Sequence, residues 1–156
     1  MRDETAILED VRRALDGPDD RTVKLRRVAS ILREGGGYRW VGIYEISGAE
    51  IALGAWSGPG APTTTRFPAS RGLCGDAVTR RRTIVVGDVG KDPRYFETFA
   101  DTKSEIVVPI LNMVTGAALA VIDVESDRPD AFRDTDRRWI EHVASEIAAA
   151  LSPSPG

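Results

Sequence analysis

The chain has 156 residues and a net charge of −3, which suits one domain and provides no basic face of the kind that binds nucleic acid. Its apolar runs are far shorter than the ~20 residues of a membrane-spanning helix. One cysteine, Cys74, and one histidine, His142, exclude an intramolecular disulfide, a cysteine-based metal cluster and His-pair metal motifs. The acidic start, MRDETAILED, lacks the apolar segment of a signal peptide, so we expect a cytoplasmic protein that binds neither membrane nor nucleic acid.

The first half of the chain changes from helical to strand periodicity near Trp40. Apolar residues recur every three to four positions before this point and every two positions after it. A Ser47-Gly48 turn then joins two strands as a hairpin. In chain order we expect a helix over residues 3–15, a helix from Asp20 to a break at Gly35-Gly36-Gly37, strands over 40–46 and 50–56, and a loop over 57–69 that crosses the sheet.

The second half alternates short elements with loops and ends in a strongly amphipathic helix. Its apolar positions include Trp139, Val143 and Ile147, and it ends before Pro153. In chain order we expect a short helix capped by Ser70, a strand over 83–86, a loop over 87–102 with a helical turn after Pro93, strands over 105–111 and 117–124, and a last helix capped by Asp134 or Thr135.

This order of elements predicts an α+β fold in which the N- and C-terminal helices pack on one face of an antiparallel sheet. Loops and the short helix would then roof the other face and leave a pocket there. We expect residues 1–151 to form a single domain, with the N-terminal helices in residues 1–35, and residues 152–156 to be a disordered tail.

Two pairs of residues are candidates for that pocket. Trp40 and Tyr44 are four apart on one strand, and Asp123 and Glu125 are two apart on another, so each pair shares a face. Two carboxylates in an apolar strand are costly to bury without a cation, and an ammonium group beside an aromatic wall would satisfy them. The alternative is that Asp123 to Asp127 is the polar exit of a strand and that Trp40 belongs to the core. The pattern alone favours this alternative.

Four segments resemble the free methionine-(R)-sulfoxide reductases, which have a GAF fold. They are Trp40-Val41-Gly42-Ile43-Tyr44, Arg71-Gly72-Leu73-Cys74-Gly75, Ser104-Glu105-Ile106-Val107-Val108-Pro109-Ile110 and Val121-Ile122-Asp123-Val124-Glu125-Ser126. The resemblance implies about six antiparallel strands with flanking helices. It also implies a cytosolic homodimer that reduces free methionine-(R)-sulfoxide with thioredoxin as electron donor. From the residues themselves we expect no metal or other cofactor, because the single histidine, His142, lies on the last helix.

The same resemblance implies a ligand site. The positions that match the family's pocket are Trp40, Tyr44, Glu105, Asp123 and Glu125. Glu125 replaces the aspartate that is more usual there, so its carboxylate reaches one methylene further. For Glu105, which opens its strand, the alternative is a position on the solvent side.

The cysteines match less well, because the reductases use three and this chain keeps only Cys74, with Thr64 and Thr98 at the other two positions. Sulfoxide reduction needs a thiolate nucleophile, and a second thiol normally resolves the sulfenic acid that results. Cys74 matches either role. Its place at a helix start after Arg71 would lower its pKa, whereas a lone cysteine in a turn of small residues is more often a buried space-filler.

Three hypotheses follow. The first is a GAF domain that binds a free amino-acid-like ligand and has lost the three-cysteine redox cycle. The second is an active reductase that uses Cys74 alone with an external thiol. The third is a structural or regulatory module whose pocket is filled by side chains or holds a cyclic nucleotide, although no NKFDE-like nucleotide signature is present.

Overall fold

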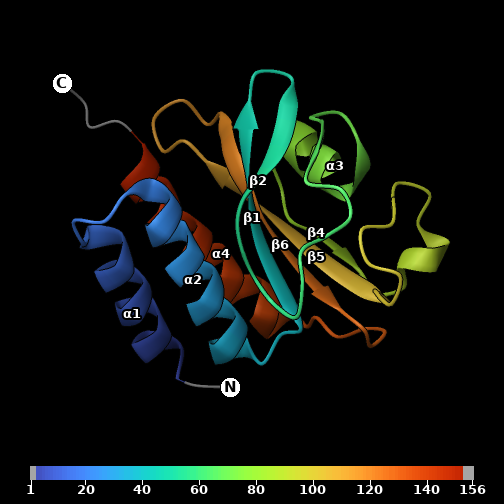
Figure 1. Ribbon diagram of the computed structural model, residues 1–156, viewed down its shortest axis with the longest axis horizontal. Coiled ribbons are helices and arrows are strands. Elements are labelled where there is room, and N and C mark those ends of the chain that lie inside the picture. Colours follow the sequence, from blue (N-terminus) through green and yellow to red (C-terminus); the bar gives the residue numbers. More distant parts are fainter. Residues whose placement is uncertain (1–2, 153–156) are drawn as a thin grey trace.

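The computed structural model describes residues 3–152 and shows one antiparallel sheet between two unlike layers. Three helices cover one face, and α3 with long loops covers the other (Figure 1). The elements are α1 (Glu4–Asp16), α2 (Arg21–Gly36), β1 (Trp40–Ser47), β2 (Glu50–Ser57), β3 (Arg66–Pro68), α3 (Gly72–Arg80), β4 (Ile84–Val86), the 3-10 helix η1 (Val89–Lys91), β5 (Ser104–Leu111), β6 (Ala118–Ser126) and α4 (Asp134–Leu151). None of the described helices is both long and apolar enough to cross a bilayer.

The sheet has six strands in the order β3-β2-β1-β6-β5-β4, all paired antiparallel. Two hairpins, β1–β2 and β5–β6, meet at the centre, where β1 pairs with β6. Both central strands are buried along most of their length because each sheet face is covered. The expected α+β fold is confirmed, including the six strands and the covered second face.

Helices α1, α2 and α4 bury one apolar face of the sheet. Val41 and Ile43 of β1, Ile122 and Val124 of β6 and Trp139 of α4 are all at most 1% exposed and belong to one cluster. Burying branched side chains of this size stabilises a domain by roughly 1.5–3 kcal/mol each. This helix-covered core is therefore the main source of stability.

The opposite face of the sheet is covered by α3 and by residues 87–103, which we call the roof loop. Apolar side chains form a second cluster there, among them Tyr44, Phe67, Leu73 and Val107. This roofed core is mixed, because it also buries polar groups, which include three carboxyl groups.

The structure corrects the expected boundaries in the first half. Residues 57–69 are not all loop, because β3 forms there by pairing with β2, with Phe67 opposite Ile51. Helix α2 also continues through Gly35 and Gly36 and ends only at Gly37, which has a φ of 69°. Glycine adopts this left-handed conformation at little cost, so the third glycine of the run ends the helix.

Further corrections concern caps and turns in the second half. Ser70 does not cap α3, because the residue before that helix is Arg71. The expected helical turn after Pro93 is instead η1, where Asp88 accepts a hydrogen bond from the Gly90 N–H at 3.1 Å. Helix α4 begins at Asp134 itself, and the Asp136 carboxylate accepts from the Arg133 N–H at 2.9 Å.

The chain end is only partly described. The Ser152 hydroxyl accepts a hydrogen bond from the Met113 N–H at 3.3 Å, which ties the end of α4 to the β5–β6 turn. The rest of the predicted disordered tail, residues 153–156, lies outside the described residues. The single-domain boundary at residue 151 stays a prediction.

Candidate functional site

The five predicted pocket residues lie on the same, roofed face of the sheet. Strand register places Trp40 opposite Glu125 and Glu125 opposite Glu105, so one row of side chains crosses β1, β6 and β5. Asp123 and Tyr44 follow at even spacing on the same face. Glu105 is only 5% exposed, so it does not occupy the solvent position that was its alternative.

An aromatic wall stands on the β1 side of this face. Trp40 contacts Phe99 edge-on at 5.1 Å between ring centroids, and Tyr44 contacts Phe67 at 5.5 Å. The Trp40 indole lies across Gly42, where a Cβ atom would come within 2.2 Å of its ring. A residue other than glycine at this position would therefore push the indole away from the sheet.

Glu105, Asp123 and Glu125, which we call the carboxyl trio, form the acidic part of the site. Their exposed fractions are 5%, 4% and 1%, and one oxygen from each lies within 4.8 Å of the others. Two charges at that separation repel by about 3.5 kcal/mol at an effective dielectric of about 20. Three unpaired negative charges therefore do not persist here, and the trio retains protons or binds a cation.

Hydrogen bonds distinguish the members of the trio. Glu125 accepts from the Thr102 hydroxyl at 2.8 Å and from the Thr98 hydroxyl at 3.2 and 3.4 Å. The Oδ1 atom of Asp123 is buried and has no hydrogen-bond partner among the described residues. Since buried polar atoms are nearly always paired, this oxygen marks where a ligand donor would bind.

The pKa values of the trio follow from this environment. Burial raises the pKa of Glu105 and Asp123 far above the usual range, and each is raised further by neighbouring carboxyl groups. Burial also raises the pKa of Glu125, but hydrogen bonds with the Thr102 hydroxyl group, Asp123, the Thr98 hydroxyl group and Glu105 oppose that shift. No lysine or arginine offsets the shift of any member.

Cys74 lines the same site from the first turn of α3 and is 6% exposed. Of the two alternatives that the sequence left open for Cys74, the structure favours the buried space-filler over the acidic thiol. Burial raises the pKa of the thiol strongly, and Asp123, Glu105 and Glu125 raise it further. Arg71 does not offset these effects, because its guanidinium group lies over the Phe96 ring at 4.4 Å.

The two threonines at the family's other cysteine positions lie on facing segments. Thr98 is buried in the roof loop and lines the cavity, whereas Thr64 is partly buried beside β3. The Thr63 N–H and hydroxyl donate to the Thr98 carbonyl at 3.3 and 3.2 Å, which joins the segments. Thr98 thus contributes a hydroxyl group to the site where the reductases carry a thiol.

The cavity between these groups is almost closed. It measures about 20 Å³ and is bounded by Tyr44, Cys74, Glu105 and Asp123 below and by Tyr95, Phe96 and Thr98 of the roof loop above. This is room for about one water, whereas sites for small organic ligands measure roughly 300–1,000 Å³. A ligand of amino-acid size enters only if the roof loop moves.

Several groups hold the roof loop closed. Arg94 forms an ion pair with Asp76 of α3 at 2.6 Å, and a second ion pair at 2.5 Å with Asp92, within the loop itself, fixes the Arg94 guanidinium group. Arg39 pairs with Asp101 near the other end of the loop. These ion pairs are partly exposed and individually weak, so they leave the loop able to open.

Sequence reasoning missed the roof-loop contribution. Tyr95, Thr102 and Phe99 were placed in a featureless loop, yet all three contact the site. A loop has no regular alternation of apolar and polar residues, so no periodic pattern marked these positions. Aromatic residues at positions 95, 96 and 99 were the one available hint that this loop covers an apolar surface.

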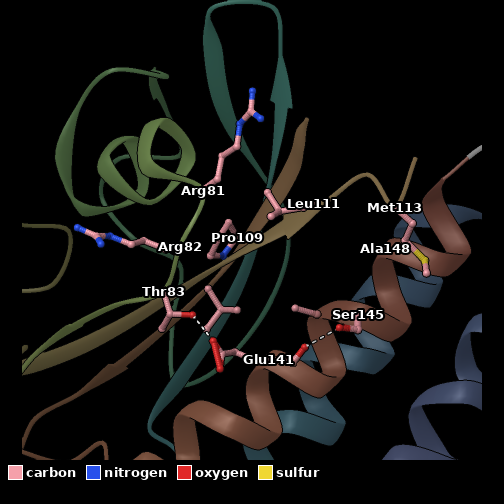
Figure 2. Close-up of a pocket in the computed structure, with 11 residues that line it drawn as sticks. Arg81, Arg82, Thr83, Pro109, Leu111, Met113, Glu141, Ser145 and Ala148 are labelled. Atoms are coloured by element: carbon pink, nitrogen blue, oxygen red, sulfur yellow. Dashed lines mark hydrogen bonds between the residues drawn. The ribbon is translucent and has the colours of Figure 1, made fainter. Parts of the chain in front are cut away.

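A separate groove of about 340 Å³ runs between α4, the end of β5 and the segment that leads from α3 into β4. In Figure 2 the Arg81 and Arg82 side chains extend away from the α4 wall. Glu141 already accepts from the Thr83 hydroxyl at 2.8 Å, and the Ser145 hydroxyl donates to the Glu141 carbonyl at 3.2 Å. Glu141 is thus already paired, and this groove does not combine acidic, thiol and aromatic groups as the roofed face does.

The carboxyl trio is also the group of described residues whose spacing would suit a cation. The sequence predicts no metal and no other cofactor, and this stays a prediction.

A six-stranded antiparallel sheet with helices on one face and a roofed, acidic and aromatic cluster on the other is the architecture of the GAF class. The chain belongs to the GAF domain family, whose pattern matches residues 20–151. Within that family it is closely related to the free methionine-R-sulfoxide reductases.

Three similarities illustrate its place in the GAF family, and two of them are to reductases. GAF domain-containing protein A of Dictyostelium discoideum is 31% identical over 138 residues, which cover 88% of this chain and 85% of that protein. The free methionine-R-sulfoxide reductase of Saccharomyces cerevisiae is 34% identical over 111 residues, 69% of this chain and 60% of that enzyme. The crystal structure of the Neisseria meningitidis free methionine-R-sulfoxide reductase with its substrate superposes with a TM-score of 0.85 at 30% identity, over 94% of this chain and 87% of that one.

Proposed function

We propose that this protein binds a free amino acid of the methionine sulfoxide type in the roofed pocket, with the ammonium group of the ligand at the carboxyl trio. The observation that carries the proposal is the Asp123 Oδ1 atom, buried among carboxyl groups beside the cavity without a hydrogen-bond partner. An ammonium group supplies both the donor and the positive charge that this position lacks. The aromatic wall suits a thioether or sulfoxide side chain.

Two of the three cysteine positions of the reductases hold threonine in this chain, which favours binding without reduction over catalysis. Threonine at positions 64 and 98 can neither attack the sulfur nor resolve a sulfenic acid. The remaining thiol, Cys74, is buried and has a strongly raised pKa, so little of it is thiolate at neutral pH.

The test is isothermal titration calorimetry with free methionine-(R)-sulfoxide, methionine and N-acetylmethionine sulfoxide. We expect the two free amino acids to bind and the N-acetylated compound, which has no ammonium group, to bind at least tenfold more weakly. Asp123→Asn should weaken binding of the free amino acids by at least tenfold, because hydrogen bonds to charged groups contribute about 1.5–3 kcal/mol.

Glu34→Gln is the matched control, since Glu34 is an exposed carboxylate on α2, behind the other face of the sheet. It should leave the affinity unchanged. If the folded wild-type protein bound none of the three compounds, the proposal would be wrong, and the nearly filled cavity would favour a structural or regulatory module.

The alternative is a reductase that uses Cys74 alone, and the presence of Cys74 in the wall of the same cavity favours it. The thiolate would attack the sulfoxide sulfur and take its oxygen, giving a sulfenic acid and free methionine. Two equivalents of an external thiol would then return the sulfenic acid to the thiol and release water and a disulfide. This hypothesis predicts turnover with dithiothreitol, poor turnover with thioredoxin, and complete loss in Cys74→Ser.

Two further proposals come from the reductase resemblance: a cytoplasmic location and a homodimer. Light scattering over a hundredfold range of protein concentration tests the dimer. A monomer mass at every concentration would contradict it.

A further inference from the structure

The carboxyl trio is not symmetrical, and the two roof-loop threonines contribute to the asymmetry. Both hydroxyl groups donate to Glu125, and neither donates to Glu105 or Asp123. Glu125 is also separated from the cavity, whose walls include Glu105, Asp123 and Thr98. One member is therefore anchored and covered, and the other two face the space where a ligand would bind.

We propose that Thr98 and Thr102 are positioning residues that hold Glu125 as the ionised member of the trio, so that the proton retained by the trio lies on Glu105 or Asp123, beside the cavity. Hydroxyl donors favour the charged form of a carboxyl group. The negative charge on Glu125 in turn keeps a proton on its neighbours, since their oxygens lie within 4.8 Å.

The other groups around the trio do not supply a competing charge. Tyr44 of β1, Cys74 of α3 and Tyr95 of the roof loop all face the trio, and burial raises the pKa of each, so all three are neutral at pH 7. Strand β4 contributes Ile84 and Val86, which do not titrate. Glu97, which also lies near Tyr95, is exposed on the roof loop, where water screens its charge.

The direct test follows the three carboxyl carbons by NMR in uniformly 13C-labelled, ligand-free protein between pH 4 and pH 9. We expect the Glu125 carboxyl group to ionise at lower pH than both Glu105 and Asp123. In Thr102→Val the Glu125 midpoint should rise by at least about half a pH unit, because its shortest hydrogen bond is lost.

Thr102→Ser keeps the hydroxyl group and should restore the wild-type midpoint. If Thr102→Val and Thr102→Ser shifted the Glu125 midpoint equally, Thr102 would act only by packing and the proposal would be wrong.

Thr83→Val is the matched control, because the Thr83 hydroxyl also donates to a glutamate, Glu141, but in the groove away from the pocket. It should leave all three midpoints unchanged. If Glu125 were the last member to ionise, the proposal would also be overturned.

The consequence for binding rests on the proposed function. If an ammonium group takes the place of the shared proton, each ligand releases about one proton at pH values below the midpoint of Glu105 and Asp123. The affinity then rises up to about tenfold per pH unit below that midpoint. Calorimetry in two buffers with different heats of ionisation measures the number of protons released.

Binding without proton release would show that the ligand does not displace a proton, while the NMR titration would still decide the role of the threonines. Conversely, absence of any binding would count against the proposed function alone, because the NMR titration needs no ligand.

Discussion

The two faces of the same sheet serve different purposes, although their residues alternate along the same strands. On β6, Ile122 and Val124 point into the helix-covered core. Asp123 and Glu125, which alternate with them along the strand, point into the roofed core. The first face is apolar and fully packed. The second face buries three carboxyl groups, and their burial lowers the stability of the fold. Such a local loss of stability is expected at a functional site.

The largest effect should come from opening a space in the helix-covered core. Ile122→Ala is expected to lower the free energy of unfolding by about 2–5 kcal/mol, because the side chain is fully buried and the helices cannot collapse into the gap. Asp123→Asn, one residue further along the strand, should cause no such loss at pH 8, because it removes a group whose ionisation opposes burial. Urea unfolding at pH 8 measures both, and equal losses would contradict the contrast between the faces.

The next effect is a pH dependence that belongs to the roofed face alone. The pKa values of Glu105 and Asp123 are raised in the folded state, so between about pH 5 and pH 8 the folded protein holds protons that the unfolded chain has lost. Stability should therefore fall as the pH rises through this window, by up to about 1.4 kcal/mol per pH unit for each proton retained.

Urea unfolding at a series of pH values checks this, with the Glu105→Gln/Asp123→Asn variant as reference. The variant should show a flatter profile than the wild type. A wild-type protein that gained stability relative to the variant on going from pH 5 to pH 8 would show that the sign is wrong.

The smallest effect should come from the groove beside α4. Thr83→Val removes a partly buried hydrogen bond to Glu141 and is expected to lower the free energy of unfolding by about 0.5–1.5 kcal/mol. The affinity for amino acids should not change, because the groove and the roofed pocket share no lining residue. Calorimetry and urea unfolding together test this, and a change in affinity above threefold would link the two regions.

The sequence predicted the layers and the shared face because both depend on periodicity. Alternation along β1 and β6 fixed which side chains point together, and Trp40, Tyr44, Asp123 and Glu125 follow it. The roof was not predictable in the same way. Thr102 and Phe99 reach the site only through the path of a loop, and the closeness of Glu105 to Asp123 depends on the pairing of β5 with β6.

The two alternatives for Cys74 stayed open for a related reason. Helix position and a neighbouring arginine are local features that a sequence shows, and both pointed to an acidic thiol. Burial under the roof loop and, to a smaller extent, the carboxyl groups of β5 and β6 raise the pKa instead, and all of these come from segments far away in the chain. Arg71, meanwhile, is held by an aromatic ring of the roof loop.

The closed roof loop also has a kinetic consequence. Since a cavity of about 20 Å³ admits no amino acid, association can occur only during the intervals in which Arg94 and Arg39 release the loop from the rest of the fold. The observed rate of association should then level off at high ligand concentration, and its plateau equals the frequency of loop opening. In stopped-flow traces, loop opening rather than diffusion then limits the rate of binding.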